Sequence, residues 1–148
     1  MTTVPGARLR LSRELAASAE ELFALFTDPV QLAVWFGPAA FTVPFESVSI
    51  ELRDGGAWAL SMVESASGRA YPVRGTIVSF TPGERLELRL DADDGDDGLR
   101  DVSLRIRFLD GGLELEQGPL TGEQRDRTAR GWELSFQKID AILAAHSA

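Results

Sequence analysis

The chain of 148 residues has no cysteine and only one histidine, His146. Without cysteine there is no disulfide, no thiolate nucleophile and no cysteine-bound zinc. Because His146 lies third from the C-terminus, we expect no His-based catalytic triad, and one histidine alone excludes a multi-histidine metal site. We therefore expect no metal and no cofactor, and we assign no catalytic residue.

Basic residues and long apolar runs are also scarce. Fifteen basic residues face 23 acidic ones, for a net charge of −8. Such a surface repels the phosphates of nucleic acids and anionic membranes, so we expect neither as a partner. No apolar run reaches the roughly 18–20 residues that span a bilayer, and the first residues lack the pattern of an export signal. The expected location is the cytoplasm.

The length fits one domain, which we place at residues 8–146. Residues 8–15 alternate between apolar and polar side chains, which predicts a strand. Ser18 and Glu21 form a capping box at the start of a helix. Asp28-Pro29 ends that helix and begins a short second one. The apolar residues of this second helix, which ends at Gly37-Pro38, are Leu32, Val34, Trp35 and Phe36.

From residue 45 the apolar period becomes two, which predicts hairpins. A three-residue loop at 54–56 would pair Leu52 with Trp58 and Ile50 with Leu60. Asp110-Gly111 predicts a type I′ turn with Leu109 opposite Gly112. That register makes one face apolar and pairs arginine with glutamate on the other. The predicted pairs are Phe108–Leu113, Ile106–Leu115, Arg107–Glu114 and Arg105–Glu116.

Further strands are expected near 71–80 and 84–91, joined by a turn at 81–84. Gly75 is a possible bulge, so the pattern leaves open whether Ile77, or Val78 with Phe80, faces inward. Thr121 and Gln124 predict a second capping box, followed by a long helix to about Ala145. Its apolar face carries Thr128, Trp132, Ser135, Phe136, Ile139, Ile142 and Leu143.

The fold class is therefore α+β. A curved antiparallel sheet of about six to seven strands packs on a long C-terminal helix, and two short helices follow the first strand. The terminal helix is the only element long enough to cover the apolar face of the sheet.

Several motifs carry a family resemblance over residues 8–144. They are Ala17-Ser18-Ala19-Glu20-Glu21-Leu22-Phe23, Thr27-Asp28-Pro29, Gly55-Gly56-Ala57-Trp58, Pro82-Gly83-Glu84-Arg85-Leu86 and Gly131-Trp132-Glu133. In this order they resemble the SRPBCC (START-like) superfamily and its AHSA-like branch, named for an activator of a heat-shock chaperone ATPase. The resemblance implies a helix-grip fold with a cavity between sheet and helix, small apolar ligands, and a link to stress response.

Two departures from the family limit what carries over. Many relatives have a histidine three residues before the Gly-Trp pair, where this chain has Thr128. The eukaryotic co-chaperones of the family carry a separate N-terminal chaperone-binding domain, whereas about seven residues precede the fold here. We therefore do not expect a chaperone partner.

The candidate cavity lining combines apolar side chains with a few inward polar ones. It consists of Trp35, Phe36, Trp58, Leu60, Met62, Glu64, Tyr71, Gln117, Thr128, Trp132 and Phe136. Three tryptophans are hard to pack between one helix and one sheet without an opening, and ligand sites are commonly apolar clefts. The alternatives are that the aromatic residues fill the core, and that Glu64 and Gln117 lie in water at strand ends.

The run Asp91–Gly98 does not match the spacing of a calcium loop, and we expect a solvated loop there. The expected function is binding of a small hydrophobic or amphipathic molecule. One alternative is a hydrolase or cyclase-like isomerase that uses Glu64 or Tyr71 as acid or base. The other is a protein-interaction module of the co-chaperone type, and a homodimer is possible in each case.

Overall fold

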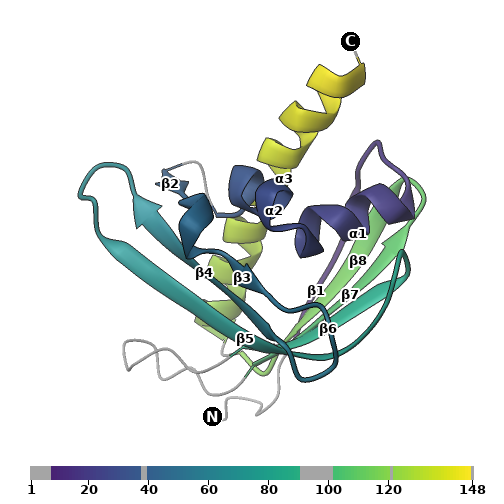
Figure 1. The fold of residues 1–148 in the computed structure, drawn as a ribbon, viewed down its shortest axis with the longest axis horizontal. Coiled ribbons are helices and arrows are strands. Elements are labelled where there is room, and N and C mark those ends of the chain that lie inside the picture. Colours follow the sequence, from purple (N-terminus) through teal and green to yellow (C-terminus); the bar gives the residue numbers. More distant parts are fainter. Residues whose placement is uncertain (1–7, 38–39, 91–101, 121, 148) are drawn as a thin grey trace.

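The computed structural model describes residues 8–37, 40–90, 102–120 and 122–147. Within these residues, eight strands form one antiparallel sheet with three helices on its inner side (Figure 1). The strands are β1 (Leu9–Glu14), β2 (Phe41–Thr42), β3 (Ser49–Ile50), β4 (Ala57–Glu64), β5 (Ala70–Thr81), β6 (Arg85–Leu90), β7 (Val102–Leu109) and β8 (Gly112–Gly118). Their order is β1-β8-β7-β6-β5-β4-β2, and β3 also pairs with β4. The predicted α+β class with a long C-terminal helix is confirmed.

The helices are α1 (Ala19–Thr27), α2 (Pro29–Trp35) and α3 (Gly122–Ser147). The predicted capping box is present: the Ser18 hydroxyl accepts from the Glu21 N–H at 3.2 Å, and the Glu21 carboxylate accepts from the Ser18 N–H at 2.9 Å. Asp28 ends α1 and caps α2, as predicted. Of the apolar residues in this short helix, Leu32 and Trp35 are buried, whereas Val34 is 61% exposed.

The β7–β8 hairpin has the predicted register, from Leu109 opposite Gly112 to Arg105 opposite Glu116. The predicted turn type is wrong, because only Gly111 of the two turn residues has a positive φ, 92°, and type I′ needs two. The turn is held by other contacts. The Asp110 carboxylate accepts from the Ala19 N–H at 2.9 Å, and the Gly111 N–H donates to the Ala17 carbonyl at 2.9 Å.

The β3–β4 register differs from the prediction by two residues, because Ile50 lies opposite Trp58 and not Leu60. Leu52 is consequently outside the ladder and exposed. The connection is longer than expected because it bonds to β5: the Gly55 N–H donates to the Ile77 carbonyl at 2.7 Å. Gly56 makes the tight loop possible, since a Cβ there would lie 2.0 Å from the Glu51 carbonyl oxygen.

The bulge in β5 lies at Val78 and not at Gly75. Ile77 pairs with Leu88 and Ser79 with Glu87, so Val78 is the extra residue. This answers the open question of parity: Ile77 is fully buried and Phe80 packs against the core, while Val78 is 44% exposed.

The inner face of the sheet is covered by α3 at one end and by α1 and α2 at the other (Figure 1). The expectation that α3 alone covers it is therefore wrong. Phe23 and Phe26 of α1 both contact the Phe108 ring of β7, with centroids 5.5 Å apart. The 26 residues of α3 extend about 39 Å, so its last turns pass the sheet and lie beside α2 (Figure 1).

Two expectations, the cap at Thr121 and the solvated loop at 91–98, lie outside the described residues. None of the helices in the described ranges is long and apolar enough to cross a membrane.

Candidate functional site

Six aromatic rings meet where α1, α2, β4 and α3 converge, and we call them the aromatic cluster. They are Phe26, Trp35, Phe36, Trp58, Trp132 and Phe136. The Phe36 ring lies near the centre, with centroid distances of 5.5 Å to Trp35, 5.6 Å to Trp58 and 6.2 Å to Trp132. Five of the predicted lining residues are thus brought together, in direct contact with one another.

The three indole N–H groups of the aromatic cluster all donate to acceptors inside the protein. Trp35 donates to the Leu25 carbonyl at 2.7 Å and Trp58 to the Phe26 carbonyl at 3.0 Å. Trp132 donates to the side-chain oxygen of Gln117 at 2.8 Å. Buried polar groups are costly without partners, so these bonds fix the orientation of the rings.

Gln117 is 9% exposed on the inner face of β8. The structure therefore supports the inward position of this side chain over the alternative of a strand end in water. Its bond to Trp132 joins the sheet to α3. Leu60 is also buried beside the cluster, and Thr128 is half-buried one helical turn before Trp132.

The other predicted residues lie farther along β4 and β5. Met62 is opposite Tyr71 in the ladder, and the Tyr71 ring contacts Phe41 at 5.7 Å. The Glu64 carboxylate accepts from the Ser67 hydroxyl at 2.6 Å in the following turn. Glu64 and Tyr71 share no contact in the described part of the chain, so the structure does not assemble them into an acid–base pair.

A pocket of about 570 Å³ lies among α1, α2 and the last turns of α3, and we call it the helical pocket. It is lined by Glu21, Ala24, Leu25, Val30, Gln31, Val34, Ile142, Leu143 and Ala145. None of these residues was among the predicted lining. One sequence signal could have found them: α3 is longer than any strand, so the apolar side chains of its last turns must be covered by something other than the sheet.

The surroundings of two basic side chains, Arg13 and Lys138, shift their pKa values in opposite directions. Arg13, on the inward-facing side of β1, bonds to Glu133 and Asp140 of α3, and these bonds raise the pKa of its guanidinium. Lys138 donates to the Phe41 carbonyl at 3.0 Å, and burial lowers the pKa of its amine. Neither residue lines the helical pocket, whose only ionisable side chain among the described residues is Glu21.

The chain resembles several solved bacterial proteins. A protein from Chromobacterium violaceum is 27% identical with a TM-score of 0.80, covering 92% of this chain and 96% of that one. The AHSA1 protein from Silicibacter pomeroyi is 30% identical with a TM-score of 0.75, covering 95% of this chain and 99% of that one. No curated protein matches the chain significantly.

The family model described as "Activator of Hsp90 ATPase homolog 1-like protein" matches residues 16–144. This range runs from α1 almost to the end of α3, so it includes the aromatic cluster and nearly all of the helical pocket. The chain therefore belongs to the AHSA1 family, the AHSA-like branch of the SRPBCC superfamily.

Proposed function

We propose that this chain binds a small hydrophobic or amphipathic molecule in the helical pocket. The observation that carries the proposal is the pocket itself, because its volume of about 570 Å³ falls in the 300–1,000 Å³ range of ligand sites. Val30 and Val34 of α2 are 59% and 61% exposed at its edge. Gln31 and Glu21 supply polar groups that could orient the polar end of a ligand.

The helical pocket is favoured over the interior of the aromatic cluster for a physical reason. A ligand inside the cluster must displace rings that contact each other and whose indole N–H groups are already bonded. A ligand in the helical pocket displaces only water. Leu25 connects the two regions, because it lines the pocket and its carbonyl accepts from Trp35. Trp35 of the predicted lining is thus bonded directly to the wall of the helical pocket.

The proposal can be tested with n-alkanols of increasing chain length. Saturable binding should change tryptophan fluorescence, because Trp35 is bonded to a residue that lines the pocket. At a hundred times the dissociation constant, binding adds about 2.7 kcal/mol of stability. For a domain of this size that corresponds to a rise in melting temperature of about 5–10 °C.

A matched pair of variants locates the site. Val34→Asp puts a charge at the pocket edge, whereas Val78→Asp puts one on the opposite side of the sheet at a similarly exposed valine. We expect Val34→Asp to weaken alkanol binding by about tenfold or more, since burying an unpaired charge is costly, and Val78→Asp to leave it unchanged. Binding that survives Val34→Asp but changes its chain-length preference in Trp132→Ala would place the ligand in the aromatic cluster instead.

A further inference from the structure

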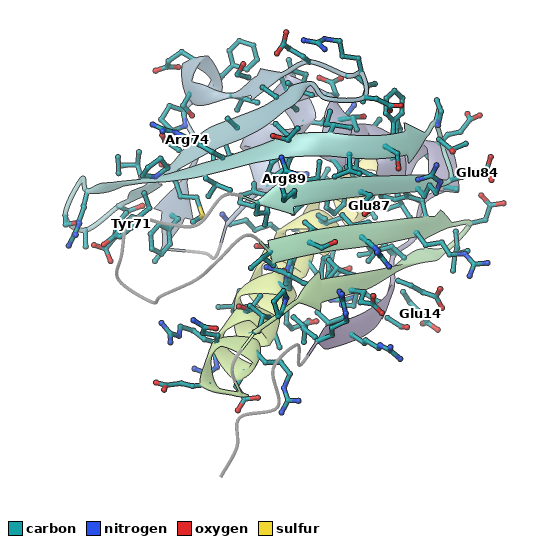
Figure 2. All side chains as sticks on the ribbon, turned by 90° about the horizontal axis from the view of Figure 1, so that it is seen from below. Glu14, Tyr71, Arg74, Glu84, Glu87 and Arg89 are labelled. Atoms are coloured by element: carbon teal, nitrogen blue, oxygen red, sulfur yellow. The ribbon has the colours of Figure 1, made fainter. Side chains whose placement is uncertain are left out.

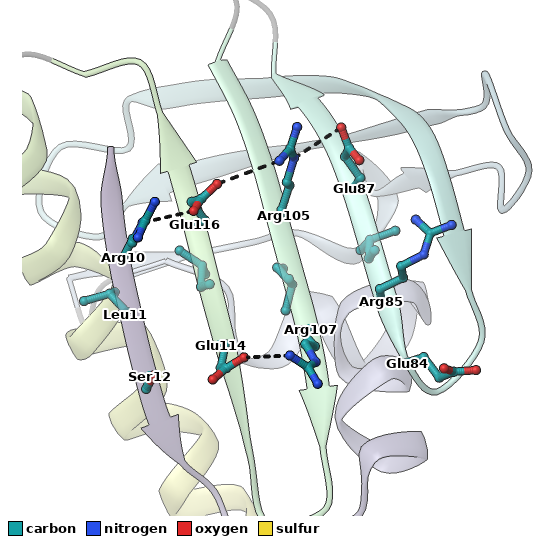
Figure 3. Close-up of a pocket in the computed structure, with 13 residues that line it drawn as sticks. Arg10, Leu11, Ser12, Glu84, Arg85, Glu87, Arg105, Arg107, Glu114 and Glu116 are labelled. Carbon is teal, nitrogen blue, oxygen red and sulfur yellow. Dashed lines mark ion pairs between the residues drawn. The ribbon is translucent and has the colours of Figure 1, made fainter. Parts of the chain in front are cut away.

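The outer face of the sheet carries a groove of about 640 Å³ that crosses β1, β8, β7 and β6. Figure 2 looks toward this side of the sheet, where Arg89 and Glu87 lie one after the other along β6. The side chains that flank the groove form two rows, each with one residue per strand (Figure 3). The first row is Arg10, Glu116, Arg105 and Glu87; the second row is Ser12, Glu114, Arg107 and Arg85.

Within one chain these rows are only partly neutralised. In the first row, Glu116 lies 3.1 Å from Arg10 and 3.9 Å from Arg105, and Glu87 lies 3.5 Å from Arg105. In the second row, Glu114 lies 3.5 Å from Arg107. Arg85, by contrast, is directly opposite Arg107 in the ladder, and like charges in that position are destabilising. Arg85 donates to the Ser79 hydroxyl at 2.8 Å, and in the described part of the chain no carboxylate pairs with it.

The charges also alternate from strand to strand. On the outer face of the sheet, β8 carries Glu114 and Glu116, while the neighbouring β7 carries Arg105 and Arg107. A twofold axis parallel to the strands and midway between β7 and β8 places the β7 of one copy over the β8 of another. Each arginine pair then faces a glutamate pair, and the contact is reciprocal, as twofold symmetry requires.

We propose that this outer face binds a second copy of the same chain about that axis. The outer strands agree with the arrangement, since β1 then faces β6. Arg10 of each copy meets Glu87 of the other, and Arg85 meets Ser12. Along the two rows this axis gives six opposite-charge encounters and no like-charge one.

Other twofold axes in the plane of the sheet give a poorer match. An axis between β1 and β8 gives only two opposite-charge encounters, both between Arg10 and Glu116. An axis perpendicular to the strands, or one running along β7 or β8, sets a strand against itself, so that arginine meets arginine and glutamate meets glutamate. An axis between β6 and β7 brings Arg85 against Arg107. Twisted sheets pack face to face at about 30°, so the four central residues on β7 and β8 contribute most.

A second copy fits the groove better than a polyanion does. Four arginines and four glutamates line it, so its charge sums to zero. A nucleic acid would meet the four glutamates with like charge, whereas a second copy matches both signs. The arginines are well exposed, at 78% for the Arg10 side chain and 71% for Arg107. Exposed ion pairs are individually weak, so we expect a weak dimer that dissociates in high salt.

Wild-type protein is tested first by sedimentation at up to millimolar concentration. At about 0.1 M salt the Debye length of about 10 Å screens the net charge of each copy but not contacts within a few ångströms. The apparent mass should rise from the 16.1 kDa monomer toward a dimer, and it should return to the monomer at about 1 M salt. A monomer at every concentration in the lower salt would overturn the proposal.

A charge exchange then tests the axis. In Arg105→Glu/Arg107→Glu the β7 and β8 strands are both acidic, and in Glu114→Arg/Glu116→Arg they are both basic. Each variant should lose self-association by about tenfold or more, and an equimolar mixture of the two should regain it. The net charges become −12 and −4, from −8 by four units each way, so both variants stay acidic and overall attraction cannot explain recovery.

The control is Arg125→Glu/Arg130→Glu, which makes the same charge change on exposed positions of α3. It should self-associate like wild type and should not rescue the basic variant as the β7 variant does. Circular dichroism checks that each variant is folded. If the folded β7 and β8 variants do not associate on mixing, or if each still self-associates like wild type, the proposed interface is wrong.

Discussion

Arg13 links the edge strand β1 to α3, and replacing it tests how much that link stabilises the fold. Its Nε and one terminal nitrogen lie 3.1 Å from the two carboxylate oxygens of Glu133. Its terminal nitrogens lie 3.3 Å and 2.5 Å from the oxygens of Asp140. The Arg13 side chain is 22% exposed, while those of Glu133 and Asp140 are 49% and 45% exposed.

The magnitude follows from these exposures. Both carboxylates are half in water and will rehydrate when the arginine is lost, so neither becomes a buried unpaired charge. Each of the two ion pairs, Arg13–Glu133 and Arg13–Asp140, should therefore contribute about 1 kcal/mol to the free energy of unfolding, which is the upper end for exposed pairs. Losing both should cost about 2 kcal/mol in total. Arg13→Met is the appropriate change because it keeps an apolar stem next to Phe136, whose ring lies under the guanidinium.

Urea unfolding provides the assay. The free energy of unfolding should fall by about 2 kcal/mol for each 1 M of urea. Arg13→Met should therefore lower the urea concentration at half-unfolding by about 1 M without changing this m-value. The control is Arg53→Met, whose ion pair with Glu51 is 3.5 Å long and largely exposed. In an Asp140→Asn background the cost of Arg13→Met should shrink, as expected for coupled residues. Equal costs for Arg13→Met and Arg53→Met would refute the reasoning.

Two further predictions concern the sheet and the single lysine. Ile106→Ala should lower the free energy of unfolding by about 2–5 kcal/mol because it leaves a cavity in the core. Arg105→Glu, on the opposite face of the sheet, should lower it by at most about 1 kcal/mol. If urea unfolding shows Arg105→Glu to be the more destabilising change, the two faces of the sheet are misassigned. Lys138 is the only lysine, so its ¹³Cε signal can be followed alone by NMR, and burial should lower its pKa below 10.5. Because the pKa of Lys138 is lower in the folded state than in the unfolded state, stability should rise with pH between these two pKa values. A pKa of 10.5 or higher in the folded protein would contradict the burial of the amine.

Sequence reasoning succeeded where two faces of the chain constrain one register. In the β7–β8 hairpin the apolar pairs and the charged pairs both require Leu109 opposite Gly112, and the structure agrees. It failed at Leu52 because the register there depends on bonds from the loop to β5, which is distant in sequence. It could name two possible parities for β5, but only the pairing with β6 places the bulge at Val78.

At the candidate site, too, residue spacing predicts which side chains face inward, whereas their packing depends on how the helices are placed. Amphipathic spacing identifies Trp132 and Phe136 as inward residues of α3, and the structure buries both. Spacing alone does not show whether inward rings enclose a void or touch one another, since that depends on how α1, α2 and α3 are placed. The helical pocket is harder still to predict, because Val34 and Ile142, more than a hundred residues apart, lie in its lining.

The pairing of β1 with β8 has a consequence for folding during synthesis. Leu9 lies opposite Gln117, so β1 has no partner until β8, more than a hundred residues later, has been made. Strands β4 to β7 pair with their neighbours in sequence and can form first. Until β8 and α3 emerge, the apolar sides of α1 and α2 lack their final cover, which is a state prone to aggregation. We therefore expect nascent chains that stop before residue 112 to be the ones that need protection in the cell.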